Sequence, residues 1–198
     1  MSGADIADKG LDAPVGRLRI FVGVKIAGEI AKELAQMARV LEQSPAKLIA
    51  PAEIHLTLVP PWNVSDPTDV IEPLGAIVGG FAAFMLTFAH LGYGPQPRWP
   101  RFLWVDCSAP DALATIRAAL LHTFGPSDER PFRPHVTLAR LRDSGAAIAR
   151  RHPIDRELSF TQRVATIELF RSPPPGAAGY QVLASLPLRA YDGSRPAV

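Results

Sequence analysis

Two short segments of the sequence repeat one chemical pattern, His-x-Thr-Leu. The first is His55-Leu56-Thr57-Leu58 and the second is His135-Val136-Thr137-Leu138, so two of the five histidines lie in the same context. Each segment offers an imidazole and a hydroxyl together. A pair of histidines suits acid–base chemistry at neutral pH, because an ordinary imidazole pKa of about 6.5 allows one ring to be charged while the other is neutral.

The reaction that this pair favours is displacement at a phosphodiester. One neutral imidazole would take a proton from the attacking water, and the other, protonated, would donate to the departing oxygen. The hydroxyls of Thr57 and Thr137 can donate hydrogen bonds to the non-bridging phosphate oxygens, where negative charge grows in the transition state. We therefore predict His55 and His135 as catalytic residues and the two threonines as phosphate ligands.

Both repeats read as strands, and this decides which side chains meet. Residues two apart on a strand project from the same face, so each histidine shares a face with its threonine. The alternating residues Leu56, Leu58, Val136 and Leu138 then point the other way, into a core. If the two strands lie side by side, both imidazoles and both hydroxyls converge on a single groove.

The rest of the chain mixes strand and helix patterns. Apolar residues at helical spacing predict helices over 27–43 and 109–124, and a further helix is expected to begin near Ser65 or Asp66. Strand patterns cover 17–25, 53–59, 84–91, 101–107, 134–140, 158–170 and 181–188, and 144–151 reads as a short helix. Pro60 and Pro61 are expected to end the strand that carries His55.

Composition excludes several classes of protein. A formal charge of +2 is too small for a protein that coats nucleic acid through phosphate neutralisation alone. Cys107 is the single cysteine, so there is no intrachain disulfide, and we expect a cytoplasmic protein. Residues 1–16 are expected to be a disordered leader and 191–198 a flexible tail, and no apolar run is long enough for a membrane span.

Two rival interpretations of the histidines are less well supported. A zinc site would need a second ligand close to each histidine, and Glu53 has no matching carboxylate beside His135, so no metal is expected. A non-enzymatic RNA-binding module would be expected to lose one of the two histidines, and both are present. The aromatic residues Phe21, Trp62, Trp104 and Tyr180 could line a substrate site or pack in the core, and the sequence leaves this open.

The segments HLTL at 55–58 and HVTLAR at 135–140 resemble the motifs of the 2H phosphoesterase superfamily, and within it the RNA 2′,3′-cyclic phosphodiesterase or 2′-5′ RNA ligase family. RIFVGV near the start, PRFLWV at 100–105 and LFRS at 169–172 extend the resemblance from about Arg19 to Leu188. It implies an α+β fold over residues 17–190: a bilobal domain with two antiparallel sheets, flanked by helices, around a central cleft, and with no cofactor.

The resemblance also implies an activity. It is hydrolysis of a 2′,3′-cyclic phosphate on RNA ends or cyclic nucleotides to a 2′-phosphomonoester, with reversal to 2′-5′ ligation. His55 would protonate the leaving 3′ oxygen, His135 would activate water, and Arg140 would contact the phosphate. A monomer is expected. The first motif continues as VPPWNVSD, unlike many relatives, which keeps a 2′-5′ phosphodiesterase or another cyclic-phosphate enzyme open as alternatives.

Overall fold

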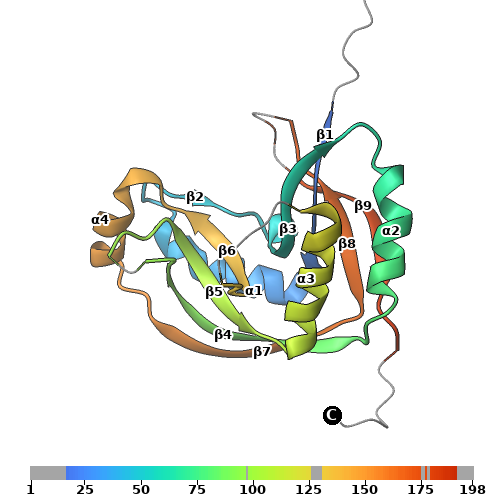
Figure 1. Cartoon of the computed structure of the whole chain (residues 1–198). Helices are drawn as coiled ribbons and strands as arrows, with labels where there is room; N and C mark the ends of the chain where they lie inside the picture. Colours follow the sequence, from blue (N-terminus) through green and yellow to red (C-terminus); the bar gives the residue numbers. More distant parts are fainter. Residues whose placement is uncertain (1–16, 97, 126–130, 175–176, 178, 191–198) are drawn as a thin grey trace, which may run out of the picture.

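A computed structural model of the chain describes residues 17–96, 98–125, 131–174, 177 and 179–190. The predicted leader, 1–16, and the predicted tail, 191–198, lie outside these residues. The described part is an α+β fold, as the sequence predicted, and it is built on one large antiparallel sheet (Figure 1). Within the described ranges, no helix has the length and apolar character needed to span a membrane.

The elements follow one another along the chain with short connections. The strands are β1 (Leu18–Lys25), β2 (Lys47–Leu48), β3 (His55–Val64), β4 (Phe84–Gly94), β5 (Phe102–Ser108), β6 (His135–Arg140), β7 (Arg156–Val164), β8 (Thr166–Arg171) and β9 (Gln181–Pro187). The α-helices are α1 (Gly28–Ala38), α2 (Thr68–Val78), α3 (Asp111–Phe124) and α4 (Gly145–Arg151), and the 3₁₀ turns are η1 (Arg39–Leu41), η2 (Pro51–Glu53) and η3 (Arg142–Ser144).

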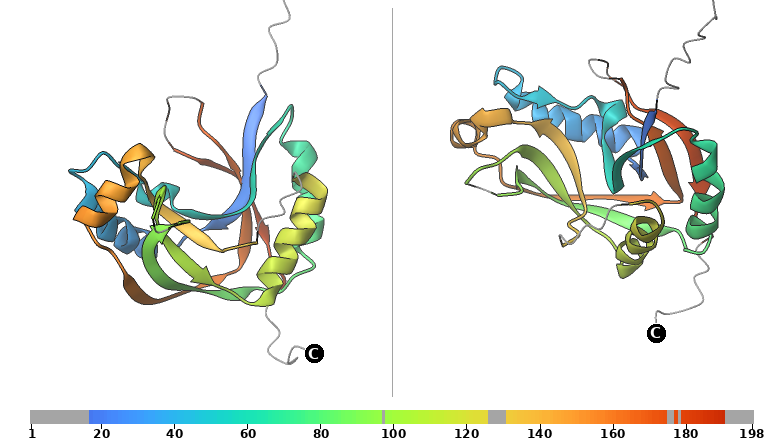
Figure 2. Two further views of the ribbon diagram at one scale, coloured as in Figure 1. Left: turned by 60° about the vertical axis from the view of Figure 1, so that its left-hand side comes forward. Right: turned by 45° about the horizontal axis from the view of Figure 1, so that its top comes forward.

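The sheet has two halves that meet at the predicted catalytic strands. Its strand order is β7-β4-β5-β6-β3-β1-β8-β9, with β2 paired to β6. The halves join through a short antiparallel contact in which Leu56 of β3 pairs with Val136 of β6. The two predicted sheets are thus continuous at this seam, and the whole sheet is strongly curved (Figure 2).

The helices share one hydrophobic core with the inward face of the sheet. Alternation places Leu56 and Leu58 of β3 and Val136 and Leu138 of β6 in this core, all fully or almost fully buried. Apolar stripes on α1, α2 and α3 cover the same face, and α2 and α3 lie side by side (Figure 2). Helix α3 follows a strand of one half and packs on β3 of the other, which ties the halves together.

The strand that carries His55 is longer than predicted, because it continues through two prolines. The pairing of β1 with β3 shifts register twice, so that Ile20 pairs with Trp62 and Val22 with Val59, and neither proline has a partner in β1. A proline cannot donate to a ladder hydrogen bond, and an irregular stretch removes the need for that donor. The prediction that Pro60 and Pro61 end the strand was therefore wrong.

The stretch 158–170 reads as one strand but forms two. Residues Arg156–Val164 make β7, which pairs with β4, and Thr166–Arg171 make β8, which pairs with β1 in the other half. Ala165 lies between them. Residue types on both sides favour strand, and only the long-range pairing shows that the chain crosses here from one half of the sheet to the other.

Candidate active site

The seam between β3 and β6 brings both His-x-Thr segments to one place. Leu56 and Val136 are opposite each other in antiparallel strands, so the direction of the strands sets His55 beside Thr137 and Thr57 beside His135. The four side chains line one small pocket of about 90 Å³ with Ile49, Glu53, Arg140 and Tyr180. All five residues predicted from the sequence are therefore in contact with the same cavity.

Each histidine is held by the carbonyl group two residues before it. The Nδ1 atom of His55 lies 2.7 Å from the oxygen of Glu53, and Nδ1 of His135 lies 2.8 Å from the oxygen of Arg133. A carbonyl oxygen only accepts, so Nδ1 carries the proton in both rings. The Nε2 atom is then the one left to accept or donate a proton in the pocket. The sequence pattern did not predict that both histidines share this hydrogen bond to a main-chain carbonyl.

Aromatic rings form the wall behind His55. The ring centroid of His55 lies 4.8 Å from that of Phe21 and 5.0 Å from that of Tyr180, which meets it edge-on. Phe170 stacks on Phe21 from the neighbouring strand. Glu53 also accepts a hydrogen bond from the backbone N–H of Gly179, 2.6 Å away, next to Tyr180. Phe21 and Tyr180, which the sequence left open, thus belong to the site.

A different aromatic wall lies behind His135. The indole of Trp104 is 4.4 Å from the His135 ring, centroid to centroid, and is only 4% exposed. Trp104 pairs directly with Thr137 across β5 and β6. Because so little of the residue reaches solvent, Trp104 is mainly a packing surface for the His135 ring, and a small part of it also lines a neighbouring pocket.

Arg140 reaches the pocket because the pairing of β6 contains an irregularity. Arg140 is an odd number of positions from His135, so regular alternation would put the two on opposite faces. The register shifts between Leu103 and Trp104 of β5, and the shift lets Arg140 pair with Phe102, on the same face as Trp104. Arg140 therefore joins the two histidines at the pocket.

The charges around the pocket act on His55. Burial is the main cause that lowers the pKa of His55 below its usual value, and the positive charge of Arg140 lowers it further. The carbonyl and carboxylate of Glu53 act in the opposite direction. In the absence of an anion, His55 is thus held toward its neutral form, beside cationic and hydroxyl groups that suit a phosphate.

A larger chamber adjoins the small pocket and shares Thr57 and His135 with it. Its volume is about 440 Å³. Prolines and aromatic rings make up most of its wall, and two arginines flank it: Pro60, Pro95, Pro131, Phe102, Trp104, Phe132, Arg117 and Arg133. The small polar pocket and the larger apolar chamber together suit a ligand that has one anionic and one apolar part.

The remaining histidines and Trp62 lie elsewhere. His90 contacts Asp155, and His152 lies 3.4 Å from the hydroxyl of Ser44. Trp62 stacks near Phe124 of α3, 6.0 Å between centroids, and so packs against a helix. Among the residues described, no three His, Cys, Asp or Glu side chains gather as a metal site would require.

Comparisons with known proteins found relatives in both sequence and fold. The sequence model of the 2′-5′ RNA ligase superfamily matches residues 26–172. An RNA 2′,3′-cyclic phosphodiesterase of Archaeoglobus fulgidus is 23% identical over 138 residues, which are 67% of this chain and 77% of that protein. A protein with the same description from Aeropyrum pernix is 34% identical over 105 residues, covering 50% of this chain and 58% of the relative. The crystal structure of TT0787 of Thermus thermophilus superposes with a TM-score of 0.69 at 26% identity, covering 88% of this chain and all of that one.

Proposed function

Because the chain belongs to the 2′-5′ RNA ligase superfamily, a family of enzymes that includes 2′,3′-cyclic phosphodiesterases, we propose that it hydrolyses 2′,3′-cyclic phosphates on RNA ends or nucleotides to 2′-phosphomonoesters. His55 and His135 are the acid–base pair, and the reaction needs no metal. The observation that carries the proposal is the shared pocket in which both Nδ1 atoms are tied to carbonyls, which leaves both Nε2 atoms for proton transfer.

The reaction proceeds by one displacement at phosphorus. Nε2 of neutral His135 accepts a proton from water as the water oxygen bonds to phosphorus. The bond from phosphorus to the 3′ oxygen breaks, and Nε2 of protonated His55 gives its proton to that oxygen. One water is consumed, and the products are a 2′-phosphate and a free 3′ hydroxyl.

Thr57, Thr137 and Arg140 hold the phosphate during this step. Each threonine hydroxyl donates to a non-bridging oxygen, and the guanidinium of Arg140 supplies positive charge. Hydrogen bonds of this kind are strongest when charge accumulates on the acceptor, so they favour the transition state over the bound substrate.

His55 becomes an acid only after the substrate has entered. Burial and Arg140 lower its pKa in the empty pocket. A bound phosphodiester brings a negative charge next to both the ring and Arg140, which opposes both causes and favours the protonated ring. Substrate binding thus prepares the proton that the leaving oxygen needs.

The adjoining chamber supports a nucleotide as the substrate. An apolar space of about 440 Å³ next to the phosphate pocket suits a nucleobase, which inorganic phosphate lacks. A 5′ hydroxyl of RNA in place of water would give a 2′-5′ linkage by the same displacement, so reversible ligation is part of the proposal as a second activity. We place this activity in the cytoplasm, where the single Cys107 would stay reduced.

The test is turnover of an oligonucleotide that ends in a 2′,3′-cyclic phosphate, with excess EDTA and with products separated by chromatography and mass spectrometry. The expected product is a 2′-phosphate, formed at the same rate with and without EDTA. His55→Ala and His135→Ala should each lower kcat by about 10²- to 10⁴-fold. His122→Ala, which changes an exposed histidine on α3, is the matched control and should keep the parent rate.

Other outcomes would identify the alternatives. Loss of activity on chelation would contradict the metal-free mechanism. Cleavage of a linear 2′-5′ linked oligonucleotide in place of the cyclic end would make the protein a 2′-5′ phosphodiesterase. RNA binding without turnover of any phosphodiester would favour the binding module.

A further inference from the structure

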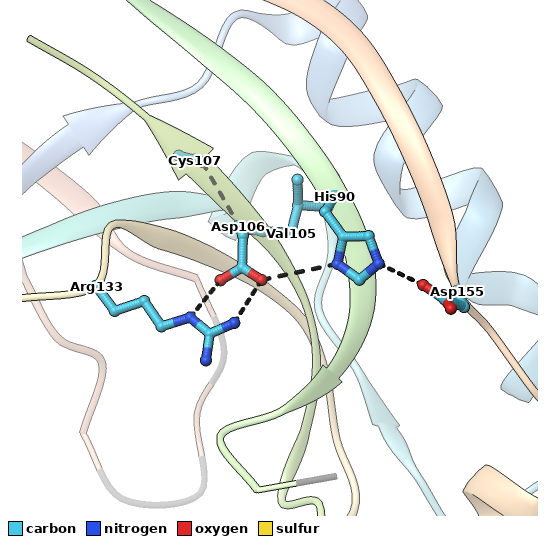
Figure 3. Close-up of polar contacts among 6 residues, drawn as sticks. All are labelled: His90, Val105, Asp106, Cys107, Arg133 and Asp155. Carbon is cyan, nitrogen blue, oxygen red and sulfur yellow. Dashed lines mark hydrogen bonds and ion pairs between the residues drawn. The ribbon is translucent and has the colours of Figure 1, made fainter.

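A row of charged side chains leads from the surface to the wall behind His135. Asp155 contacts Nε2 of His90, and Nδ1 of His90 lies 3.8 Å from Asp106. Asp106 in turn pairs with Arg133 (Figure 3). The mechanism above uses none of the first three residues, and it uses Arg133 through its main-chain carbonyl, while the Arg133 side chain also flanks the larger chamber.

The pair between Asp106 and Arg133 is the best-defined contact in this row. Nε of Arg133 donates to Oδ1 of Asp106 at 2.8 Å, and Nη2 donates to Oδ2 at 2.8 Å. Two parallel hydrogen bonds fix the plane and position of the guanidinium in a way that one contact could not. His90 lies farther from the same carboxylate, at 3.8 Å, so Arg133 is the partner that Asp106 holds in place.

Arg133 touches the environment of His135 in two ways. Its main-chain oxygen accepts the Nδ1 proton of His135 at 2.8 Å. Its guanidinium carbon lies over the indole of Trp104, 4.9 Å from the ring centroid, and Trp104 packs against the His135 ring at 4.4 Å. One residue therefore supports both the hydrogen bond and the aromatic surface that orient the imidazole.

We propose that Asp106 is a positioning residue for His135, acting through Arg133 and Trp104. Asp106 lies on β5, in register with His135 on β6, but its carboxylate is occupied by Arg133. When the guanidinium is clamped, Trp104 stays against His135 and Nε2 keeps its direction toward the phosphate. This inference rests on the proposed function, because it assigns Asp106 a role in the same reaction.

The solvent exposure of Asp106 and Arg133 indicates that their ion pair contributes little to the stability of the fold. The side chain of Asp106 is 19% exposed and that of Arg133 is 58% exposed. Ion pairs with this much contact with water add little to folding stability. Removing the carboxylate should therefore leave the protein folded and act mainly on the geometry of the catalytic ring, where small displacements are costly.

The experiment compares Asp106→Asn with Asp155→Asn in the full chain. Asp106→Asn should lower kcat by about tenfold or more, and the fall in kcat should exceed any rise in KM, since the carboxylate is not part of the phosphate pocket and only its partner Arg133 borders the chamber. Asp155→Asn makes the same chemical change at a side chain that is 91% exposed and does not contact Arg133, and it should keep the parent kcat. Equal kcat values for the two variants would overturn the proposal.

A double-mutant cycle tests whether Asp106 acts through Arg133. Arg133→Lys keeps the charge and the carbonyl but cannot form the two-pronged pair. If Asp106 acts through Arg133, the double variant should lose no more kcat than the worse single variant. Losses that multiply would contradict the proposed route. Unfolding midpoints of all variants, measured in parallel, report whether each one remains folded.

The His135 ring provides a readout that does not depend on turnover. Imidazole ¹⁵N spectra should show altered or exchange-broadened His135 signals in Asp106→Asn, while the His55 signals, from the other wall, stay as in the parent. Unchanged His135 signals would refute the positioning role. If the parent protein turns over no cyclic phosphate, the proposed function fails, and the ring spectra still decide whether Asp106 orients His135.

Discussion

The substitution Gly23→Ala tests how closely β1 must approach β3 for the site to form. A Cβ atom at Gly23 would lie 2.5 Å from the carbonyl oxygen of Leu56, which is backbone and cannot rotate away. Carbon–oxygen contacts are ordinarily about 3.3 Å or longer, so the chain at Leu56 must retreat by about 0.8 Å. Leu56 lies between His55 and Thr57 and makes the pair with Val136 on the opposite edge of β3, so its retreat from β1 displaces half of the pocket relative to β6.

The expected cost falls more on activity than on folding. Overpacking of this kind destabilises a fold by about 1–3 kcal/mol, against a usual total stability of about 5–15 kcal/mol, so most molecules should stay folded. A displacement of about 1 Å at reacting groups costs roughly 10²-fold in rate, and we therefore expect Gly23→Ala to lose about 10- to 100-fold in kcat on the cyclic-phosphate oligonucleotide. Urea unfolding measures the stability of the same samples.

Gly28→Ala is the matched control. Apart from its chain neighbours and the backbone of its own helix, no heavy atom lies within 4 Å of a Cβ at Gly28, which begins α1, so this change should leave both kcat and stability at or slightly above parent values. If Gly23→Ala were folded and as active as Gly28→Ala, the close approach of β1 to β3 would not position the site.

Two further predictions follow from the pKa of His55. Arg140→Gln removes a positive charge that lowers this pKa, so the pKa of His55 should rise in NMR titration of the free protein, while KM for the cyclic phosphate increases; an unchanged titration would mean that Arg140 does not act on the ring. Burial lowers the pKa of His55 in the folded chain, whereas in the unfolded chain this residue takes up a proton below about pH 6.5. His55 therefore reduces the free energy of unfolding as the pH falls from about 6.5 to its lower pKa in the folded chain. His55→Gln should flatten that part of a plot of urea-derived stability against pH, and an identical slope in both proteins would contradict the direction of the shift.

The repeated His-x-Thr-Leu pattern made the centre of the candidate site predictable. Period-two alternation put Leu56 and Val136 in the core and their neighbours on the opposite face, as the structure has them. That prediction assumed that β3 and β6 lie side by side, because the sequence carries no local signal for the pairing of strands that are far apart in the chain. The structure shows this pairing in the short contact between Leu56 and Val136.

Local irregularities were not predictable for the same reason. The register shift that turns Arg140 toward the pocket depends on how β5 and β6 align, and only the family resemblance pointed to this residue. The break at Ala165 and the passage of β3 through Pro60 and Pro61 likewise depend on long-range pairing. The carbonyls of Glu53 and Arg133 escaped prediction because any residue type offers one.

The most direct test of the two-histidine mechanism uses a cyclic substrate in which sulfur replaces the leaving 3′ oxygen. A thiol has a pKa of about 8.5 and leaves without a proton from an acid, whereas an alkoxide needs one. The mechanism predicts that sulfur restores His55→Ala to within about tenfold of the parent, while His135→Ala, which lacks the base, stays about 10²- to 10⁴-fold slower. Rescue of His135→Ala in place of His55→Ala, or of neither variant, would contradict it.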